Sequence, residues 1–324
     1  MPVLLEITGL RTEFRVKGGT VKAVRGVDLA VEAGETLALV GESGCGKSIT
    51  AASVLRLVPP PGKIVAGSIR FKGKELLELS EEGMREIRGN RIAMVFQDPM
   101  TSLNPVFTVG YQVAEGLRIH RGLSAAAAER EAVDLLAQVG IPAAIERIRD
   151  YPHQLSGGMR QRVMIAMALA CGPELVIADE PTTALDVTIQ AQILELLDRL
   201  MAQNRMGLVL ITHNLGIVAE RAHKTAIMYA GEIVESAATE ELFANPLHPY
   251  TKGLLASLPE FGTPGEKLAT FAGGVPDLKS DFIGCPFRER CPIGDAECGK
   301  ANIEMREVAP GHLVRCRKVS CPPY

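Results

Sequence analysis

The sequence predicts an α/β fold, in which a largely parallel sheet carries an antiparallel flank and is interrupted by an all-helical segment. Short apolar runs typical of buried strands occur at residues 36–40, 175–178 and 208–211. Stretches with helical spacing separate these runs, and a glycine-rich loop follows the first of them. Strands that alternate with helices in this way are typical of a sheet covered by helices on both faces.

The flank and the helical segment can each be placed in the sequence. Residues 3–40 alternate in a β-like pattern, with turns at Gly18-Gly19 and Ala33-Gly34. A further strand is expected over residues 91–96, directly before Gln97. From about residue 109 to residue 170 the apolar spacing becomes helical. The expected architecture is therefore a mixed sheet with a helical insertion of about residues 100–170.

The glycine-rich loop, residues 41–48, reads Gly-Glu-Ser-Gly-Cys-Gly-Lys-Ser and matches the phosphate-binding pattern G-x-x-x-x-G-K-[ST]. It lies between the strand at 36–40 and a helix expected over 49–57, which is the context that the pattern requires. Its backbone N–H groups would face phosphates, with Lys47 on the β- and γ-phosphates and Ser48 on Mg²⁺. A glycine-rich turn before a core helix is the alternative. The expected nucleotide-binding residues are Ser43, Gly44, Cys45, Gly46, Lys47, Ser48 and Ile49.

Two carboxylates, Asp179 and Glu180, follow the apolar run at 175–178. They therefore belong at the carboxyl end of a strand, where open α/β sheets bind nucleotides. Asp179 is expected to hold Mg²⁺, and Glu180 to orient or deprotonate an attacking water. An isolated Asp-Glu pair is usually a solvated loop, but its place after the phosphate-binding loop and before Pro181 favours the catalytic interpretation.

A second anion-binding helix start is predicted at Ser156-Gly157-Gly158, before the helical segment 159–170. Ser156 suits the N-cap position, and the two glycines allow a phosphate to approach the backbone closely. A single ATP molecule does not need two anion-binding helix N-termini. The pattern therefore indicates that the two ends serve different ATP molecules.

Leu155-Ser-Gly-Gly-Met159 resembles the signature of ATP-binding-cassette (ABC) ATPases, and the ordered motifs resemble that family from about residue 3 to residue 250. In this family two cassettes dimerise head to tail, and each ATP lies between the phosphate loop of one and the signature of the other. The resemblance implies catalytic roles for Glu180, His213 and Gln97. Its other implied roles are Mg²⁺ binding by Ser48, Gln97 and Asp179, ATP contacts by Ser156, Gly157, Gly158 and His213, interface crossing by Asp186, and adenine stacking by Phe14.

Residues 245–316 resemble the carboxy-terminal extension of ATPases from dipeptide, oligopeptide and nickel importers of bacteria and archaea. The resemblance rests on Asn245-Pro-Leu-His-Pro-Tyr-Thr251, on Gly273-Gly-Val-Pro276 and on the segment 284–291. It implies an ABC ATPase domain over residues 1–245 and a small cysteine-rich extension over residues 246–324.

Four cysteines of this extension are candidates for a metal site, with the spacing C-x5-C-x6-C-x17-C: Cys285, Cys291, Cys298 and Cys316. Disulfides fit poorly in a reducing compartment, whereas four thiolates can hold zinc or an iron–sulfur cluster. The spacing lacks the C-x2-C pairs of structural zinc, and unligated thiols stay open as a third reading. The resembling importers imply a [4Fe-4S] cluster. Cys45 and Cys171 are expected to be small packing residues.

Composition limits the function classes. The net charge is −3 with dispersed Lys and Arg, which gives no basic footprint for nucleic acid. No apolar stretch approaches the roughly 18 residues that span a bilayer, and the first residues are not typical of a secretory signal. A role at a membrane is therefore expected to depend on partner subunits.

The resemblance implies an ATP-hydrolysing subunit of an importer for dipeptides, oligopeptides or a related solute such as a nickel chelate or glutathione. It also implies a second, related ATPase chain, two membrane permease subunits and, indirectly, an extracytoplasmic solute-binding protein. The expected location is peripheral, on the cytoplasmic face of the inner membrane. A soluble non-transport ABC ATPase is the competing hypothesis. Repair members usually carry coiled-coil insertions and translation members two cassettes, and the extension also favours the importer.

Overall fold

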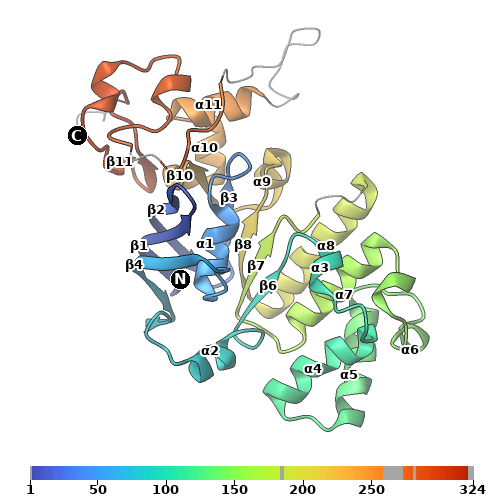
Figure 1. Cartoon of the computed structure of the whole chain (residues 1–324). Coiled ribbons are helices and arrows are strands. Elements are labelled where there is room, and N and C mark those ends of the chain that lie inside the picture. The colour runs from blue at the N-terminus through green and yellow to red at the C-terminus, as the bar shows by residue number, and fades with distance from the viewer. Residues whose placement is uncertain (1, 183–185, 258–272, 280–281, 320–324) are drawn as a thin grey trace. The chain divides into compact units, whose positions relative to one another are not determined.

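The computed structural model describes residues 2–182, 186–257, 273–279 and 282–319 (Figure 1). Its backbone divides into two compact units. The first unit consists of residues 1–4, 31–34 and 78–210, and the second of residues 5–30, 35–77 and 211–324.

In the second unit, strands from the first 75 residues of the chain form an antiparallel sheet with the strand order β2-β1-β4-β5. Strand β1 pairs with β4 in a register that places Leu5 opposite Phe71 and Phe14 opposite Gly62. This sheet is the antiparallel flank that the sequence predicts. Its strands are β1 (Val3–Val16), β2 (Gly19–Glu32), β4 (Gly62–Phe71) and β5 (Lys74–Glu75).

The second unit also contains strands in the order β11-β12-β10-β9-β3. Strands β3 and β9 are parallel, whereas β10 is antiparallel to β9 and to β12. These strands are β3 (Thr36–Val40), β9 (Lys224–Tyr229), β10 (Glu232–Ala238), β11 (Arg306–Ala309) and β12 (His312–Val314). The helices are α1 (Lys47–Val54), α9 (Leu215–Arg221), α10 (Thr239–Ala244), α11 (Pro249–Ala256), η3 (Arg288–Arg290) and η4 (Ala296–Gly299).

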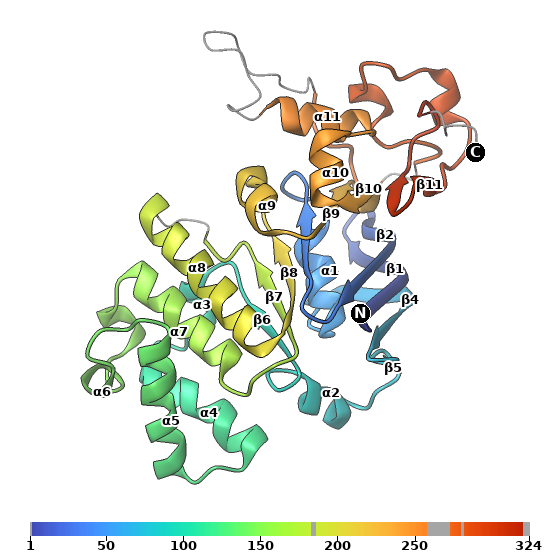
Figure 2. The same ribbon diagram turned by 180° about the vertical axis from the view of Figure 1, so that it is seen from behind.

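The first unit contains parallel strands and the helical insertion. Strands β6 (Ile92–Val95) and β7 (Leu175–Asp179) pair in parallel, with Ile92 opposite Leu175, and β8 (Gly207–Ile211) follows in the strand order. Helices α4, α5 and α7 lie side by side (Figure 2). The helices of this unit are α2 (Glu81–Ile87), α3 (Pro99–Ser102), α4 (Val109–Arg121), α5 (Ala125–Gln138), α6 (Ala144–Arg147), η1 (Pro152–Gln154), α7 (Gly157–Leu169) and α8 (Val187–Asn204).

The helix expected over residues 49–57 is shifted, and the prediction is wrong at both ends. Helix α1 begins at Lys47, inside the glycine-rich loop, and ends at Val54. Its end is a Schellman motif, in which Leu57 N donates to Ala52 O at 2.8 Å and Arg56 N donates to Ser53 O at 3.0 Å. Arg56 has a φ of 52°, so a left-handed residue, rather than the prolines that follow, ends the helix.

The core of the second unit includes residues of the carboxy-terminal extension. Tyr250 on α11 and Phe287 are fully buried and contact Tyr229 on β9, with ring centroids 4.7 Å and 5.2 Å from the Tyr229 ring. Aromatic contacts of this kind add to the free energy of burial. The extension is therefore packed into the same core as the strand β9. Among the described residues, no helix is long and apolar enough to cross a membrane.

Candidate nucleotide-binding site

The glycine-rich loop holds the Lys47 ammonium group in place with its own backbone. Lys47 is buried, and its Nζ donates to the carbonyl oxygens of Gly41, at 2.8 Å, and Glu42, at 3.1 Å. Gly46 has a φ of 110°, and a Cβ there would lie 2.3 Å from Ala23 O. A Cβ at Gly41 would lie 2.2 Å from Met228 O. Both glycines are required, because a side chain at either position would collide with backbone.

The remaining loop residues differ in exposure as phosphate binding requires. Ser43, Gly44 and Ser48 are exposed, and Ser48 lies in the first turn of α1, where N–H groups lack helical partners. Cys45 is fully buried, and its carbonyl accepts from Gly231 N at 2.9 Å. Burial raises the pKa of the Cys45 thiol, with Lys47 opposing the shift. Cys45 is thus placed as a packing residue whose backbone shapes the loop.

His213 and Phe14 lie elsewhere in the second unit. His213 is exposed and follows β8, and the adjacent Thr212 N donates to Leu39 O at 3.4 Å. This contact places His213 close to the strand that leads into the phosphate loop. Phe14 is partly buried on β1, and a Cβ at Gly62 would lie 2.5 Å from its ring. The Phe14 ring therefore occupies the space left by Gly62.

In the first unit, the predicted catalytic carboxylate of Glu180 contacts Gln97, a predicted Mg²⁺ ligand. Asp179 ends β7 and is buried, and Glu180 follows with a φ of 47°. Gln97 Nε2 donates to Glu180 Oε2 at 3.1 Å. A left-handed conformation is uncommon for glutamate, and such strained residues cluster at functional sites. The parallel pairing of β6 and β7 brings these side chains together, since each follows the carboxyl end of its strand.

The signature segment also lies in the first unit. Ser156 caps α7, and its Oγ accepts from Met159 N at 3.3 Å. Arg160 Nη1 donates to Leu155 O at 2.7 Å, which fixes the backbone just before the cap. A Cβ at Gly158 would lie 2.8 Å from Ile189 Cγ2, so the start of α7 packs closely on α8.

Asp186 is the N-cap of α8 and accepts from Ile189 N at 2.9 Å. Its carboxylate is exposed, and Ile189 is also the residue that contacts Gly158. The structure therefore brings Asp186 and the start of the signature helix into one neighbourhood. Residues 183–185, which the sequence pattern included between Glu180 and Asp186, lie outside the described residues.

The prediction of a four-cysteine metal centre is not supported. In the described ranges, no three or more His, Cys, Asp or Glu side chains are grouped so that they could hold a metal ion. Burial, followed by the influence of the other three cysteines, raises the pKa of Cys285 to about 12. The thiols of Cys285, Cys291, Cys298 and Cys316 thus share a neighbourhood without forming a ligand set. Neither a [4Fe-4S] cluster nor zinc is assigned, because sequence spacing does not determine where the sulfur atoms point.

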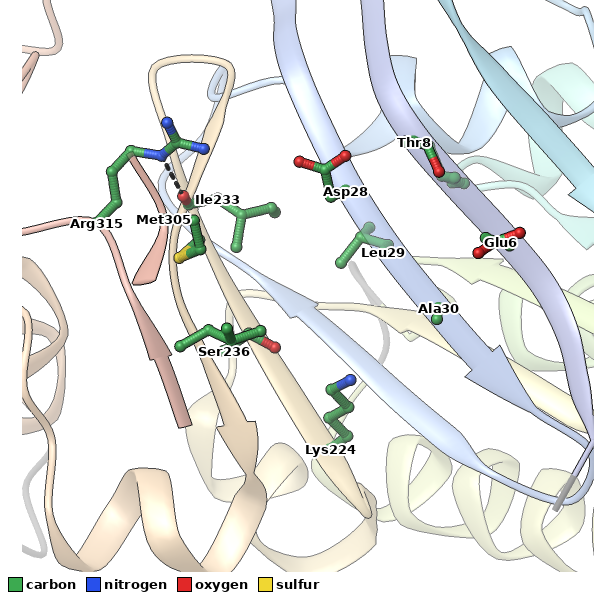
Figure 3. Close-up of a pocket in the computed structure, with 12 residues that line it drawn as sticks. Glu6, Thr8, Asp28, Leu29, Ala30, Lys224, Ile233, Ser236, Met305 and Arg315 are labelled. Carbon is green, nitrogen blue, oxygen red and sulfur yellow. Dashed lines mark hydrogen bonds between the residues drawn. The ribbon is translucent and has the colours of Figure 1, made fainter. Parts of the chain in front are cut away.

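A cavity of about 370 Å³ in the second unit lies apart from the predicted site residues. Figure 3 shows Glu6 and Asp28 on its one side and Ile233 and Arg315 on the other. Asp28 accepts from Gly9 N at 2.7 Å, and Arg315 Nε donates to Ile233 O at 3.0 Å. Both charged groups therefore bind strand backbone, and we assign no ligand to the cavity.

Glu42, Tyr250 and Arg290 form contacts at the phosphate loop that the sequence analysis did not predict. Glu42 occupies a variable position of the loop pattern, and its amide and carboxylate are bound by Tyr250 and Arg290 respectively. The Asn-Pro-Leu-His-Pro-Tyr segment contains Tyr250 and was the sequence feature that could have drawn attention to it. Arg290 had no distinguishing pattern.

The phosphate loop, the capped signature helix and the paired carboxylates define an ATPase cassette of the ABC class. The family model described as "ABC transporter" matches residues 24–183, and the model described as "Oligopeptide/dipeptide transporter, C-terminal region" matches residues 234–298. Solved structures of ABC cassettes are similar to this chain. The ABC transporter cassette MJ0796 has a TM-score of 0.66 at 26% identity, over 73% of this chain and 99% of that one. CbiO1 of Clostridium perfringens has a TM-score of 0.63 at 27% identity, over 76% and 92%.

Curated relatives narrow the class. A peptide import ATP-binding protein of Brucella melitensis is 53% identical over 97% of this chain and 96% of its own length. The dipeptide transport ATP-binding protein DppD of Bacillus subtilis is 50% identical over 98% of this chain and 95% of its own. The chain therefore belongs to the family of ATP-binding subunits of peptide ABC importers.

Proposed function

We propose that this chain hydrolyses ATP to drive the uptake of dipeptides or oligopeptides through an ABC importer. The observation that carries the proposal is the joint presence of the ABC transporter match and the oligopeptide/dipeptide transporter C-terminal match in one chain. Relatives named for peptide or dipeptide import, at about half identity over nearly the whole chain, support the substrate class. Nickel chelates and glutathione are the alternative solutes.

The phosphate loop binds the β- and γ-phosphates of ATP through its backbone N–H groups and Lys47. Ser48 and Asp179, with Gln97, would hold Mg²⁺, since hydroxyl, carboxylate and amide oxygens suit this cation. When bound, Mg²⁺ neutralises phosphate charge. The Phe14 ring stacks on adenine, and its partial exposure supports this role. His213 contacts the γ-phosphate from the end of β8.

Glu180 orients and deprotonates the attacking water, and Gln97 positions the Glu180 carboxylate. The support is the hydrogen bond between these side chains and the strained backbone of Glu180. A positioned base of this kind contributes typically 10²–10⁴-fold to a rate.

A second cassette completes each ATP site. Ser156, Gly157 and Gly158 at the start of α7 contact the ATP that is held by the partner's phosphate loop, and Asp186 crosses the interface. The exposed, capped start of a thirteen-residue helix supports anion binding there. The second cassette is a related, distinct chain.

A membrane permease subunit docks on an exposed aromatic surface of the first unit, formed by Phe107, Tyr111 and Tyr151, and the second cassette serves the second permease subunit. The rings of Phe107 and Tyr111 stack at 4.8 Å, and Val109 N donates to Asp150 O at 2.9 Å beside them. Gln112 is buried and donates to the carbonyls of Asn104 and Phe107, both at 3.0 Å.

These contacts hold the surface in place, and exposed aromatic residues on such a surface are typical of docking sites. Docking there would place the chain peripherally, on the cytoplasmic face of the membrane. An extracytoplasmic solute-binding protein would deliver the solute to the permease subunits. The ATPase domain over residues 1–245 and the extension over 246–324 act together in this role.

Co-purification tests the proposal. A tagged chain is isolated from native membranes in mild detergent, and the bound subunits are identified by mass spectrometry. Recovery of two multispanning proteins and a second cassette supports the importer, and a bound receptor would reveal the solute. Recovery of the chain alone or with soluble partners would refute it in favour of a non-transport ATPase.

A further inference from the structure

Three groups of Glu42 in the phosphate loop form hydrogen bonds: the carbonyl oxygen, the backbone N–H and the carboxylate. Its carbonyl oxygen accepts from Lys47 Nζ at 3.1 Å, so it forms part of the cradle that holds the phosphate-binding lysine. Its backbone N–H donates to the Tyr250 hydroxyl oxygen at 3.0 Å. Its carboxylate accepts two hydrogen bonds from Arg290, Nη1 to Oε2 at 2.8 Å and Nη2 to Oε1 at 3.0 Å. Tyr250 and Arg290 both come from the extension.

The ion pair with Arg290 fixes the position of the Glu42 carboxylate. A bidentate guanidinium–carboxylate pair determines both distance and orientation, unlike the point contact of a lysine. The Arg290 side chain is only 9% exposed, so solvent screens the pair weakly. Arg290 Nη1 also donates to the Tyr229 hydroxyl at 3.2 Å, which anchors the guanidinium on β9. The hydrogen bonds that Arg290 donates to the Glu42 carboxylate raise the pKa of Arg290, and the arginine stays charged.

The hydroxyl of Tyr250 is held equally firmly. Its ring is fully buried between Tyr229 and Phe287, with centroids at 4.7 Å and 5.3 Å. Tyr250 lies in the first turn of α11, where its backbone N donates to Nδ1 of the buried His248 at 3.0 Å. Burial raises the pKa of Tyr250, so the hydroxyl is neutral at physiological pH. The extension therefore presents one rigid hydroxyl and one rigid guanidinium to the loop.

We propose that Tyr250 and Arg290 are positioning residues for ATP binding, which act by holding Glu42 so that its carbonyl keeps Lys47 aligned for the phosphates. The inference rests on the proposed ATPase function and deepens it, because it makes the extension a working part of the nucleotide site. Loosening Glu42 is expected to weaken ATP binding more than it slows the chemical step.

The test compares purified variants by equilibrium titration with a fluorescent ATP analogue and by steady-state ATPase assays. Arg290→Met and Glu42→Gln are each expected to weaken nucleotide binding about tenfold, with kcat changed by less than about threefold. The double variant is expected to bind about as weakly as either single variant, because both remove the same contact. Arg288→Met is the matched control, since Arg288 is exposed and pairs with Glu289.

A merely structural role predicts different results. Arg290→Met would then lower the melting temperature without a selective change in nucleotide affinity. Alternatively, if each single variant lost about tenfold and the double variant bound roughly 100-fold more weakly than the parent, the two residues would act independently and not through their shared contact. Either result would overturn the proposal. If Arg290→Met does not fold, Arg290→Lys and Tyr250→Phe replace it. Unchanged ATP affinity in both would likewise overturn the proposal. A parent protein that binds no ATP would refute the proposed function itself.

Discussion

Gln97 donates a hydrogen bond to Glu180, with 3.1 Å between Nε2 and Oε2, although 83 positions separate the two residues in the chain. Each residue follows a strand of the parallel pair β6 and β7, so the topology brings them together. Glu180 has a positive φ, a conformation that the surrounding structure must maintain. The carboxylate expected to activate water is therefore oriented by Gln97, a residue expected to bind Mg²⁺.

Replacing Glu180 with Gln is expected to preserve ATP binding and to lower kcat by at least about 100-fold, because an amide cannot accept the proton of the attacking water. The variant should form a long-lived dimer with ATP, detectable by gel filtration. Glu174→Gln is the control, since Glu174 precedes the same strand β7 and pairs with Arg91. Turnover by the Glu180 variant at the parent rate would contradict its assigned role.

Ser156 and Ser124 provide a matched pair of helix caps. Each hydroxyl accepts a backbone hydrogen bond at 3.3 Å, from Met159 N and Ala127 N respectively. Replacing either serine with Ala should lower the free energy of unfolding by about 1 kcal/mol. Only Ser156→Ala should also impair ATP-dependent dimerisation and hydrolysis, measured by gel filtration and phosphate release. Equal effects of the two substitutions on hydrolysis would show that Ser156 acts only as a cap.

The aromatic surface should matter for transport and not for the ATPase site. Tyr111→Ser removes a stacked, exposed ring from the surface that we assign to the permease subunits. It is expected to weaken co-purification of those subunits several-fold while leaving nucleotide affinity of the isolated chain unchanged. Ile119→Ser, an exposed apolar residue on the same helix, is the control. Retention of the permease subunits by Tyr111→Ser to the same extent as by the parent would argue against this docking surface.

His248 predicts a pH dependence of stability. Burial lowers the pKa of His248 to about 3, and its Nε2 has no hydrogen-bond partner within the described residues. His248 is therefore protonated below about pH 6.5 in the unfolded state but stays neutral in the folded state. The free energy of unfolding is highest above that pH and falls as the pH decreases towards 3. Lowering the pH from 7 to 5 should decrease the free energy of unfolding by about 2 kcal/mol through this residue.

The measurement is denaturant unfolding of the parent and of His248→Asn at several pH values. Asn retains an acceptor for Tyr250 N, as Nδ1 does in the parent, and has no titratable group. The variant should lose about 2 kcal/mol less than the parent on going from pH 7 to pH 5. Identical pH profiles would show that the pKa of His248 is not lowered in the folded state.

The strands and the nucleotide loop could be predicted from sequence because their determinants are local. The runs at 36–40 and 175–178 are continuous and apolar, and the loop pattern has a fixed strand and helix context. Ser156 was recognisable as a cap for the same reason. The end of α1 was missed because Arg56 adopts a left-handed conformation, which the sequence indicates at a glycine but not at an arginine.

Contacts that depend on tertiary structure could not be predicted. Glu42 lies 208 positions from Tyr250 and 248 from Arg290, so no local pattern relates them. The cysteine spacing suggested a metal centre, but spacing does not define the directions of the side chains. Family resemblance suggested which residues have roles, whereas the structure revealed how Glu42 connects the loop to the extension.

ATP-dependent uptake tests the central claim most directly. The complex co-purified with the tagged chain is reconstituted in proteoliposomes, and accumulation of labelled dipeptides and oligopeptides is measured with ATP on the side of the cassettes. Peptide accumulation by the parent, with none when both cassettes carry Gln in place of the catalytic Glu, is the predicted result. Hydrolysis of ATP without accumulation of any peptide, or accumulation of another solute instead, would contradict the account.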